Sequence, residues 1–429
     1  MRVLIISHTV WDNGNSFGNT FSNLFEGMPN VEIYNICCKH GQANNKVVKQ
    51  AFQMTDKAVL RSIYKRNSRS GWVMDSQADK VMQSVNTELS EKAKRKRRTI
   101  SFFLRDWIWK FGAWKKNKEL HAFLRAAAPD VIYLPIYATR FMCDVQQYIV
   151  EQCHVPVVGH ISDDVYGYSP KSSLLACLYK KSLRKKLRKL INKCDYLEVF
   201  AENMQKEYSR IFKKPCYLIG KGVNCNEIPT ISYTYSQRET CHFVYTGNIG
   251  SERYQVLHAI GKALDSTSAQ RRLVLDIYSA TSITEPMRLA FADSPSIRFH
   301  GAITKDEVDQ VQREADFLVH VESFSPQAIF SAKMSLSTKI IDYLSSGKPI
   351  FAVGPMEVNS IQLLKSKNLA VVATSEEDLG KLLAELLNEK IDISAISNSV
   401  DNYLREERDI KIIQSGMQAR LNKVLEQKR

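Results

Sequence analysis

A short glycine-containing turn followed by an arginine is the first place where this sequence could bind an anion. A strand-like run, Phe243–Thr246, leads into Gly247 and Asn248. Arg253 follows six residues after that glycine, where a helix is predicted to begin. Glycine lets the backbone approach a phosphate, the helix N-terminus adds partial positive charge, and a guanidinium can bind two phosphate oxygens. The spacing predicts a diphosphate site, and an ordinary strand–turn–helix junction is the alternative.

A second group of polar residues lies on a predicted helix, Thr338–Ser345. Thr338 and Lys339 stand at its start, where free amides and a cation favour an anion. Asp342 follows one turn later and could accept hydrogen bonds from ribose hydroxyls. The segment predicts a nucleotide-binding helix. We expect Ser337 to cap this helix. The alternative is an ordinary capped helix with an exposed aspartate.

An imidazole and two carboxylates follow a predicted strand in the first half of the chain. The run from His160 to Asp163 and Asp164 could orient the hydroxyl of an acceptor or of a sugar. A half-buried histidine and a helix-capping aspartate are the alternative. The loop after the first strand supplies a further set of candidate acceptor or phosphate contacts, with a flexible turn as its alternative: Gly14, Asn15 and Gly18.

Short strands that alternate with helices position these groups. The first series opens with Arg2–Ser7, and a second opens with Cys241–Thr246 after the polar run Thr230–Thr240. Strands of about five residues between helices predict parallel, doubly wound α/β sheets. Residues 40–120 fit neither series and are predicted to form inserted long helices. The expected organisation is an N-terminal domain, a C-terminal domain and a C-terminal helix that packs back on the first domain: residues 1–228, 229–400 and 401–429.

Length, composition and cysteine usage indicate a cytoplasmic protein of two domains. The chain has 429 residues, and no apolar run reaches the roughly 18–20 residues that a membrane span needs. The opening apolar run is short and is interpreted as a buried strand, not as a signal peptide. The nine cysteines show neither C-x-x-C nor zinc-ligand spacing. We therefore expect free, mostly buried thiols and no metal site.

Two strongly basic segments account for the formal net charge of +15. Residues 92–118 hold eleven Lys or Arg beside a dense aromatic cluster, and residues 171–193 hold nine with no acid. Such segments predict helices at an anionic membrane surface. Solvated helices whose aromatics belong to the core are one alternative. Nucleic-acid binding is the other, but no such motif accompanies the charge, and we expect no nucleic acid. The predicted membrane contacts are Lys96, Arg97, Arg98, Trp107, Trp109, Trp114, Arg184, Lys185 and Arg188.

The stretch from Ser337 to Pro349 resembles the donor-binding helix of the GT-B glycosyltransferases, above all the retaining glycosyltransferase group 1 family (glycosyltransferase family 4). Asp342 falls where that family has its second glutamate, five residues before the glycine. The resemblance implies that Asp342 binds the donor ribose. It also implies that Thr338 and Lys339 meet the diphosphate.

Three further segments resemble parts of the same family. Gly247 and Arg253 match the glycine and the lysine of its G-R-L-x-x-x-K motif, whereas Asn248 replaces the arginine. The strand and turn that contain His300 resemble those beside the nucleotide base. Lys221–Asn224 resembles the turn that closes the first domain.

One carboxylate of the family pattern is displaced. The first glutamate would fall at Met334, so Glu322, further upstream, is the candidate for contacting the sugar from a longer loop.

The resemblance implies a GT-B fold, in which two Rossmann-like domains face each other across a cleft. It implies a hexosyltransferase that moves a sugar from a UDP- or GDP-sugar to an acceptor hydroxyl, with retention and without a cofactor. The predicted catalytic residues are His160, Asp163 and Glu322. The basic segments favour a lipid-linked acceptor, with a saccharide acceptor as the other possibility, in surface polysaccharide synthesis at the inner face of the plasma membrane. A sugar-nucleotide epimerase, or a membrane- or nucleic-acid-binding protein with an inactive donor site, are the alternatives.

Overall fold

The computed structural model describes residues 1–65, 68–74, 91–167, 174–236, 238–267 and 271–428, with the backbone alone for residues 91–100. The chain forms two compact units. The N-terminal unit comprises Met1–Phe200, Gln205–Ile219 and Gln414–Arg429, and the C-terminal unit comprises Ala201–Met204 and Gly220–Ile413.

The N-terminal unit is built on one sheet whose described strands run in the order β4-β3-β2-β1-β5-β6-β7-β8. All neighbours pair in parallel except β3 and β4, which are antiparallel. The central strands of this sheet are almost entirely buried, as coverage of both faces by helices requires. The strands are β1 (Arg2–Ser7), β2 (Glu32–Cys37), β3 (Val48–Met54), β4 (Gly71–Val73), β5 (Val131–Pro135), β6 (Val157–Ile161), β7 (Tyr196–Val199) and β8 (Cys216–Leu218).

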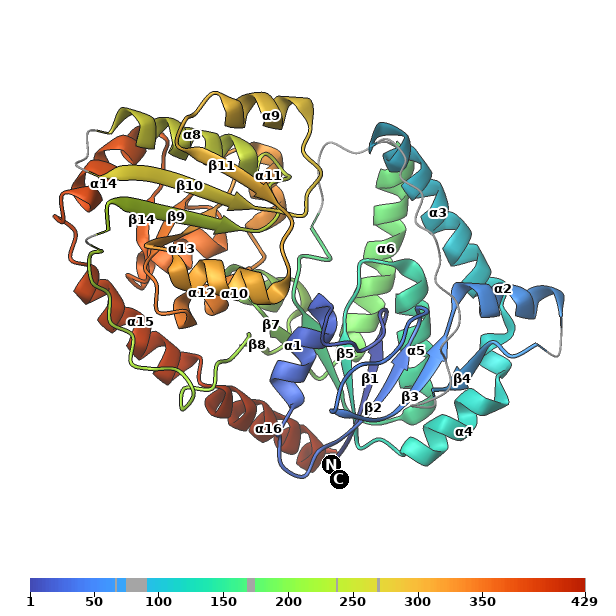
Figure 1. Ribbon diagram of the computed structural model, residues 1–429. Helices are drawn as coiled ribbons and strands as arrows, with labels where there is room; N and C mark the ends of the chain where they lie inside the picture. The colour runs from blue at the N-terminus through green and yellow to red at the C-terminus, as the bar shows by residue number, and fades with distance from the viewer. Residues whose placement is uncertain (66–67, 75–90, 168–173, 237, 268–270, 429) are drawn as a thin grey trace. The chain divides into compact units, whose positions relative to one another are not determined.

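Helices cover both faces of this sheet, with α5 and α6 packed together on the face opposite α1 (Figure 1). Residues 40–120 were expected to be inserted helices only. That prediction is wrong in part, because β3 and β4 extend the sheet: the second half of β3, Ala51–Met54, is buried. The helices of this unit are α1 (Ser16–Phe25), α2 (Asp56–Tyr64), α3 (Glu91–Phe111), η1 (Ala113–Lys116), α4 (Lys118–Ala127), α5 (Arg140–Cys153), α6 (Leu174–Lys193), α7 (Glu202–Phe212) and α16 (Ile410–Gln427).

The C-terminal unit repeats the scheme with a fully parallel sheet, ordered β11-β10-β9-β12-β13-β14. In both units the chain starts at a central strand, builds outward on one side, and then crosses to the other. That reversal is the doubly wound pattern, which places ligands beyond the carboxyl ends of the strands. The strands are β9 (Thr240–Thr246), β10 (Arg272–Tyr278), β11 (Ile297–Gly301), β12 (Phe317–Val321), β13 (Ile350–Val353) and β14 (Val371–Ala373). The prediction of two doubly wound α/β domains is confirmed.

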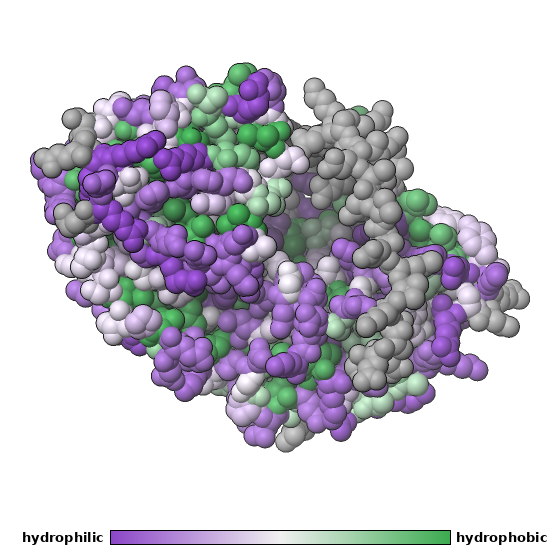
Figure 2. Space-filling view, viewed as in Figure 1, coloured by the Kyte–Doolittle hydropathy of each residue, from purple (hydrophilic) through white to green (hydrophobic). Residues whose placement is uncertain are grey.

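In this unit α8 and α9 lie over one face of the sheet, and α10 and α12 lie over the other (Figure 1). On the face shown in Figure 2, hydrophilic side chains cover most of the unit, and hydrophobic ones form small separate groups. The helices are α8 (Arg253–Ser266), α9 (Glu285–Ala292), α10 (Lys305–Glu314), α11 (Pro326–Ala332), α12 (Lys339–Ser345), α13 (Asn359–Ser366), α14 (Glu377–Leu387) and α15 (Ile393–Glu407).

None of the described helices is both long and apolar enough to span a bilayer. All nine cysteines are described and none forms a disulfide; seven are buried, as the sequence predicted.

Candidate functional site

A tight turn after β9 brings Arg253 to the start of α8. The Tyr245 hydroxyl donates to the carbonyl oxygen of Asn248 (2.7 Å), and the Asn248 side chain accepts from the backbone two residues later (2.6 Å). Ser251 and Glu252 then take left-handed backbone angles, with φ of 53° and 63°. Non-glycine residues adopt this conformation only when their surroundings hold them there. The turn therefore determines where Arg253 enters its helix.

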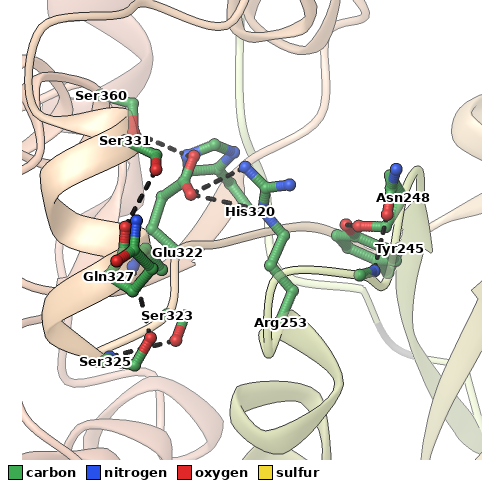
Figure 3. A network of polar contacts seen from close by, with 12 residues as sticks. Tyr245, Asn248, Arg253, His320, Glu322, Ser323, Ser325, Gln327, Ser331 and Ser360 are labelled. Atoms are coloured by element: carbon green, nitrogen blue, oxygen red, sulfur yellow. Dashed lines mark hydrogen bonds and ion pairs between the residues drawn. The ribbon is translucent and has the colours of Figure 1, made fainter. Parts of the chain in front are cut away.

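The guanidinium of Arg253 binds Glu322, which lies directly after β12 (Figure 3). Its Nη2 and Nε atoms lie 2.9 and 3.3 Å from Oε2 of Glu322. The Glu322 side chain is only 8% exposed, so this ion pair is largely shielded from water. Nε2 of His320 lies 3.8 Å from the other carboxylate oxygen of Glu322 and 3.1 Å from the Ser360 hydroxyl. Burial lowers the pKa of His320. Glu322 is thus held by an arginine in a mostly buried setting.

Lys339 adds a second cation beside the same turn. Its Nζ lies 3.4 Å from the carbonyl oxygen of Thr246, and a Cβ built on Gly247 would lie 2.8 Å from that Nζ. Burial lowers the pKa of Lys339, and the positive charge of Arg253 lowers it further. The two cations repel each other in a partly buried site, and a bound anion would relieve that repulsion. The structure therefore brings together Gly247, Arg253 and Lys339.

Asp342 lies one turn into α12 and forms an ion pair with Lys221. The Asp342 side chain is 46% exposed, whereas that of Lys221 is 17% exposed. The expected cap by Ser337 is wrong: Thr338 is the N-cap residue and makes no side-chain cap hydrogen bond. The first turn closes on backbone carbonyls instead, with the Ile340 amide donating to Ser337.

His300 belongs to a separate cluster on β9, β10 and β11. Its Nε2 lies 2.7 Å from Oδ1 of the buried Asp276, and His242 binds the other oxygen of that carboxylate at 2.8 Å. The His300 ring stacks on Tyr278 with centroids 4.5 Å apart. These contacts orient the ring and leave its side chain 37% exposed. A contact to a nucleotide base stays a prediction.

In the N-terminal unit, His160 is part of the core. The residue is 2% exposed and packs edge-on against Phe21 and Phe200. Its Nδ1 lies 2.9 Å from the Tyr133 hydroxyl, which donates to Glu198 at 2.6 Å. Since the hydroxyl proton goes to the carboxylate, the histidine must donate from Nδ1, and Nε2 carries a bare lone pair. Burial lowers the pKa of His160 to about 3, so the ring is neutral.

That burial is at odds with the predicted catalytic role of His160, because a catalytic side chain has to reach the reacting groups. Asp163, by contrast, is exposed. Asp164 organises the turn between them and α6, since its Oδ1 accepts from the Tyr208 hydroxyl at 2.8 Å and from the Gly167 amide at 2.9 Å. A role of Asp163 toward an acceptor stays a prediction.

The glycine loop after β1 has a clear structural purpose. Asn15 caps α1 by accepting from the Gly18 amide at 2.8 Å, and Gly14 donates to Asp12 at 3.0 Å. A Cβ at Gly18 would lie 2.1 Å from the backbone oxygen of Asp12, so only glycine fits there. Contact of this loop with an acceptor or phosphate stays a prediction.

Four of the six predicted membrane contacts whose side chains the structure describes are buried or packed on other residues of the unit. Trp109 and Trp114 are 2% and 1% exposed, so their predicted membrane role is wrong. Their indole nitrogens donate to Asp56 and to the Trp109 carbonyl, which makes them core residues of the unit. The guanidinium groups of Arg184 and Arg188 lie over the Tyr166 ring. Trp107 and Lys185 are exposed, and the side chains of Lys96, Arg97 and Arg98 lie outside the described part of the structure.

The architecture can be compared with that of known proteins. No model of a known protein family matches the sequence, and neither does any curated protein. Solved structures do match over the full length. Sucrose-phosphate synthase from Thermosynechococcus elongatus superposes with a TM-score of 0.61 at 10% identity, covering 99% of each chain. HepE from Anabaena, solved with UDP and glucose, gives 0.60 at 11% identity, covering 99% of this chain and all of its own. The fold is GT-B.

A third GT-B neighbour is the lipopolysaccharide outer core galactosyltransferase WaaB, with a TM-score of 0.59 at 12% identity. The match covers 98% of this chain and 100% of WaaB. At such identities the likeness establishes the fold alone, and the side chains of the site have to carry any statement about activity.

Lys221 and Asp276 are the site residues that sequence reasoning missed. Lys221 was noted only as part of a turn, because an ion pair between residues 121 positions apart leaves no local pattern in the sequence. Asp276 did have a signal, because a carboxylate inside the apolar strand Arg272–Tyr278 needs buried partners.

Proposed function

We propose that this protein is a glycosyltransferase that binds a nucleotide diphosphate sugar on its C-terminal unit. The convergence of Arg253 and Lys339 beside Gly247 carries the proposal. Two cations, a glycine that leaves room for a phosphate and the start of the 14-residue helix α8 form a place suited to a diphosphate. The GT-B fold supports it, since HepE holds UDP and glucose on that fold.

The two ion pairs of the site suggest how a bound donor would replace the internal partners of these side chains. Arg253 is bound to Glu322, and Lys221 to Asp342. A diphosphate that takes over Arg253 releases the Glu322 carboxylate to accept hydroxyls of the donor sugar. Asp342, half exposed, is released in the same way toward the ribose. Glu322 then fulfils, from its place just after β12, the role that the family pattern would place at Met334.

The proposed reaction breaks the bond between the anomeric carbon and the diphosphate oxygen. The acceptor hydroxyl forms the new bond to that carbon, the departing nucleoside diphosphate keeps the electron pair of the broken bond, and the hydroxyl proton passes to that departing diphosphate. Arg253 and Lys339 stabilise the negative charge that develops on the leaving oxygens. We infer retention of anomeric configuration and a UDP- or GDP-sugar as the donor. The reaction as proposed draws on no resident metal or cofactor.

For the acceptor we propose a lipid-linked saccharide at the inner face of the plasma membrane, in surface polysaccharide synthesis. The basic segments of the N-terminal unit support a peripheral, cytoplasmic position at an anionic surface. Among the GT-B neighbours, WaaB is named as a lipopolysaccharide galactosyltransferase.

Calorimetric titration with UDP, GDP and inorganic pyrophosphate tests the donor site. Arg253→Ala should weaken the binding of both the nucleotides and pyrophosphate. Asp342→Asn should weaken the binding of the nucleotides alone, because pyrophosphate has no ribose. Equal affinities of wild type and both variants for every probe would refute the assignment. A screen of nucleotide sugars with and without acceptor then tests transfer. Conversion of the sugar nucleotide without any acceptor would overturn transfer in favour of an epimerase.

A further inference from the structure

Helix α3 exposes a row of large apolar side chains. Leu104, Trp107 and Phe111 are 57%, 45% and 54% exposed, and their i, i+3, i+7 spacing puts them on one face of the helix. The rings of Trp107 and Phe111 touch, with centroids 5.4 Å apart, and Lys110 Nζ lies 5.4 Å from the centroid of the Phe111 ring. The neighbouring Trp109 faces the core instead. Single exposed apolar residues are ordinary, but a row on one helix face indicates a binding surface.

Helix α6 exposes a second apolar patch at its start. Leu174, Leu175 and Leu178 are 85%, 62% and 64% exposed. Lys181 and Lys185 continue the line of Leu174 and Leu178 along the helix, and both are exposed. The opposite face of α6 packs into the unit through a buried stripe: Tyr179, Leu183, Leu187, Leu190 and Ile191. The outward face is therefore leucine-rich at one end and lysine-rich along the rest.

The two helices belong to one packed assembly. They lie side by side in Figure 1. The centroid of the Tyr179 ring of α6 lies 5.9 and 5.2 Å from the ring centroids of Phe102 and Phe103 of α3. Arg140 of α5 ties them further, since it binds Asp106 of α3 at 2.7 Å and the Tyr179 ring lies 4.7 Å from its guanidinium. Six of the thirteen large hydrophobic side chains that are exposed among the described residues thus lie on two neighbouring helices.

We propose that these two faces form a docking surface for an anionic lipid bilayer. The docking surface consists of six apolar residues: Leu104, Trp107, Phe111, Leu174, Leu175 and Leu178. The segments that carry them are strongly cationic, with eleven Lys or Arg against one acid in residues 92–118 and nine against none in residues 171–193. Leucines and rings enter the acyl–headgroup boundary while the cations stay with anionic headgroups.

This charge and shape favour lipid over the other occupants. A nucleic acid would pair with the lysines but offers leucine rows nothing apolar to enter. A second copy of this chain would bring the same positive charge against itself, which opposes association. A bilayer with anionic headgroups satisfies the apolar and the cationic parts at once.

The inference deepens the proposed function and rests on it in one respect: the surface gives the transferase access to a lipid-linked acceptor. Vesicle binding itself needs neither donor nor acceptor, so the two proposals can fail separately. Loss of nucleotide binding with intact vesicle binding would refute the donor site and leave the docking surface standing.

Flotation with phosphatidylcholine vesicles, pure or containing about one third phosphatidylglycerol, tests the surface. The full-length wild type should float with the anionic vesicles alone. The variants L104S/W107S/F111S and L174S/L175S/L178S should each lower vesicle partitioning at least about tenfold, because each removes three apolar side chains from the interface. The double variant I283S/L289S removes exposed apolar residues from the C-terminal unit and should float as the wild type does.

Unchanged melting temperature and UDP affinity would show that the variants are folded. Equal flotation of both triple variants and the wild type would overturn the proposal, as would a wild type that does not float with anionic vesicles at low salt. A concentration-dependent dimer that the triple variants abolish, seen by sedimentation without lipid, would assign the surface to a second copy and also overturn it.

Discussion

The two polar networks that the sequence places after buried strands differ in one physical respect. In the C-terminal unit Arg253 and Lys339 stand beside a glycine turn with part of their surface open to water. In the N-terminal unit His160 is closed off among aromatic rings, and its chain of contacts runs through Tyr133 and Glu198 to Arg420 of α16. The first network has charge to offer a ligand. The second uses its charges internally, to hold the C-terminal helix against the sheet.

Loss of Arg420 should have the largest effect, because it breaks the internal network at a buried charge. Glu198 is fully buried and both of its closest bonds from Arg420 go to Oε1, at 2.6 and 2.9 Å. Arg420→Ala should lower the free energy of unfolding by about 3–5 kcal/mol, since it leaves an unpaired carboxylate in the core. Urea denaturation measures it.

The matched control is Lys428→Ala, which removes the partly exposed ion pair with Asp195 just after the same helix and should cost less than about 1 kcal/mol. The double variant E198Q/R420M should recover most of the loss. If Arg420→Ala were as mild as Lys428→Ala, the network would not be structural.

Loss of Arg253 should act on ligand binding. Arg253→Ala should weaken UDP or GDP binding by about 1–3 kcal/mol, the value of a charge-assisted hydrogen bond pair. Isothermal titration calorimetry measures it, with Arg210→Ala as the control, since that exposed arginine pairs with Glu207 of its own helix. A wild-type affinity in Arg253→Ala would remove the contrast between the two networks.

A pH series tests whether His160 is a neutral core residue. Its pKa falls from about 6.5 in the unfolded chain to about 3 in the folded protein. Below pH 6.5 the unfolded chain therefore takes up a proton that the folded protein does not, and stability falls as the pH falls toward 3. His160→Asn keeps a donor toward Tyr133 and removes this term. Between pH 7 and pH 5 the variant should lose about 2 kcal/mol less stability than the wild type.

Urea titrations of both proteins at the two pH values measure this difference. The cavity left by the smaller side chain costs the same at both pH values and cancels. Parallel losses in wild type and variant would mean that the ring titrates normally, and would return His160 to the set of catalytic candidates.

The smallest predicted effect separates the parts of the donor site. Asp342→Asn should weaken UDP binding by about 1 kcal/mol, as expected for one hydrogen bond, and leave pyrophosphate binding unchanged. The variant Lys221→Ala removes the same ion pair but keeps the Asp342 carboxylate, so its UDP affinity separates the effect of the ion pair from that of the carboxylate. A loss of pyrophosphate affinity in Asp342→Asn would show that Asp342 acts on the phosphate region and not on the ribose.

Much of the fold was accessible from local pattern. The strand Arg2–Ser7 was predicted to the residue, and β9 begins one residue before its predicted start at Cys241, because apolar runs bounded by turn residues are local signals. The strand β3 was missed because its first half is polar and partly exposed, and only pairing with β2 makes it a strand. The helix α11 was also missed. It lies in the insertion that separates Glu322 from α12, where the sequence predicted only a longer loop.

By itself the sequence predicted the doubly wound α/β architecture, the placement of Gly247, Arg253 and Lys339 on a turn and at two helix starts, and the two basic segments. All of these depend on neighbours in the chain, through periodicity, glycine placement and charge. Only the tertiary structure decided that Glu322 pairs with Arg253, that Lys221 reaches Asp342, that His160 and two tryptophans are buried, and that Leu104, Trp107 and Phe111 are not. Burial and ion pairing depend on residues far apart in the chain, so no local pattern encodes them.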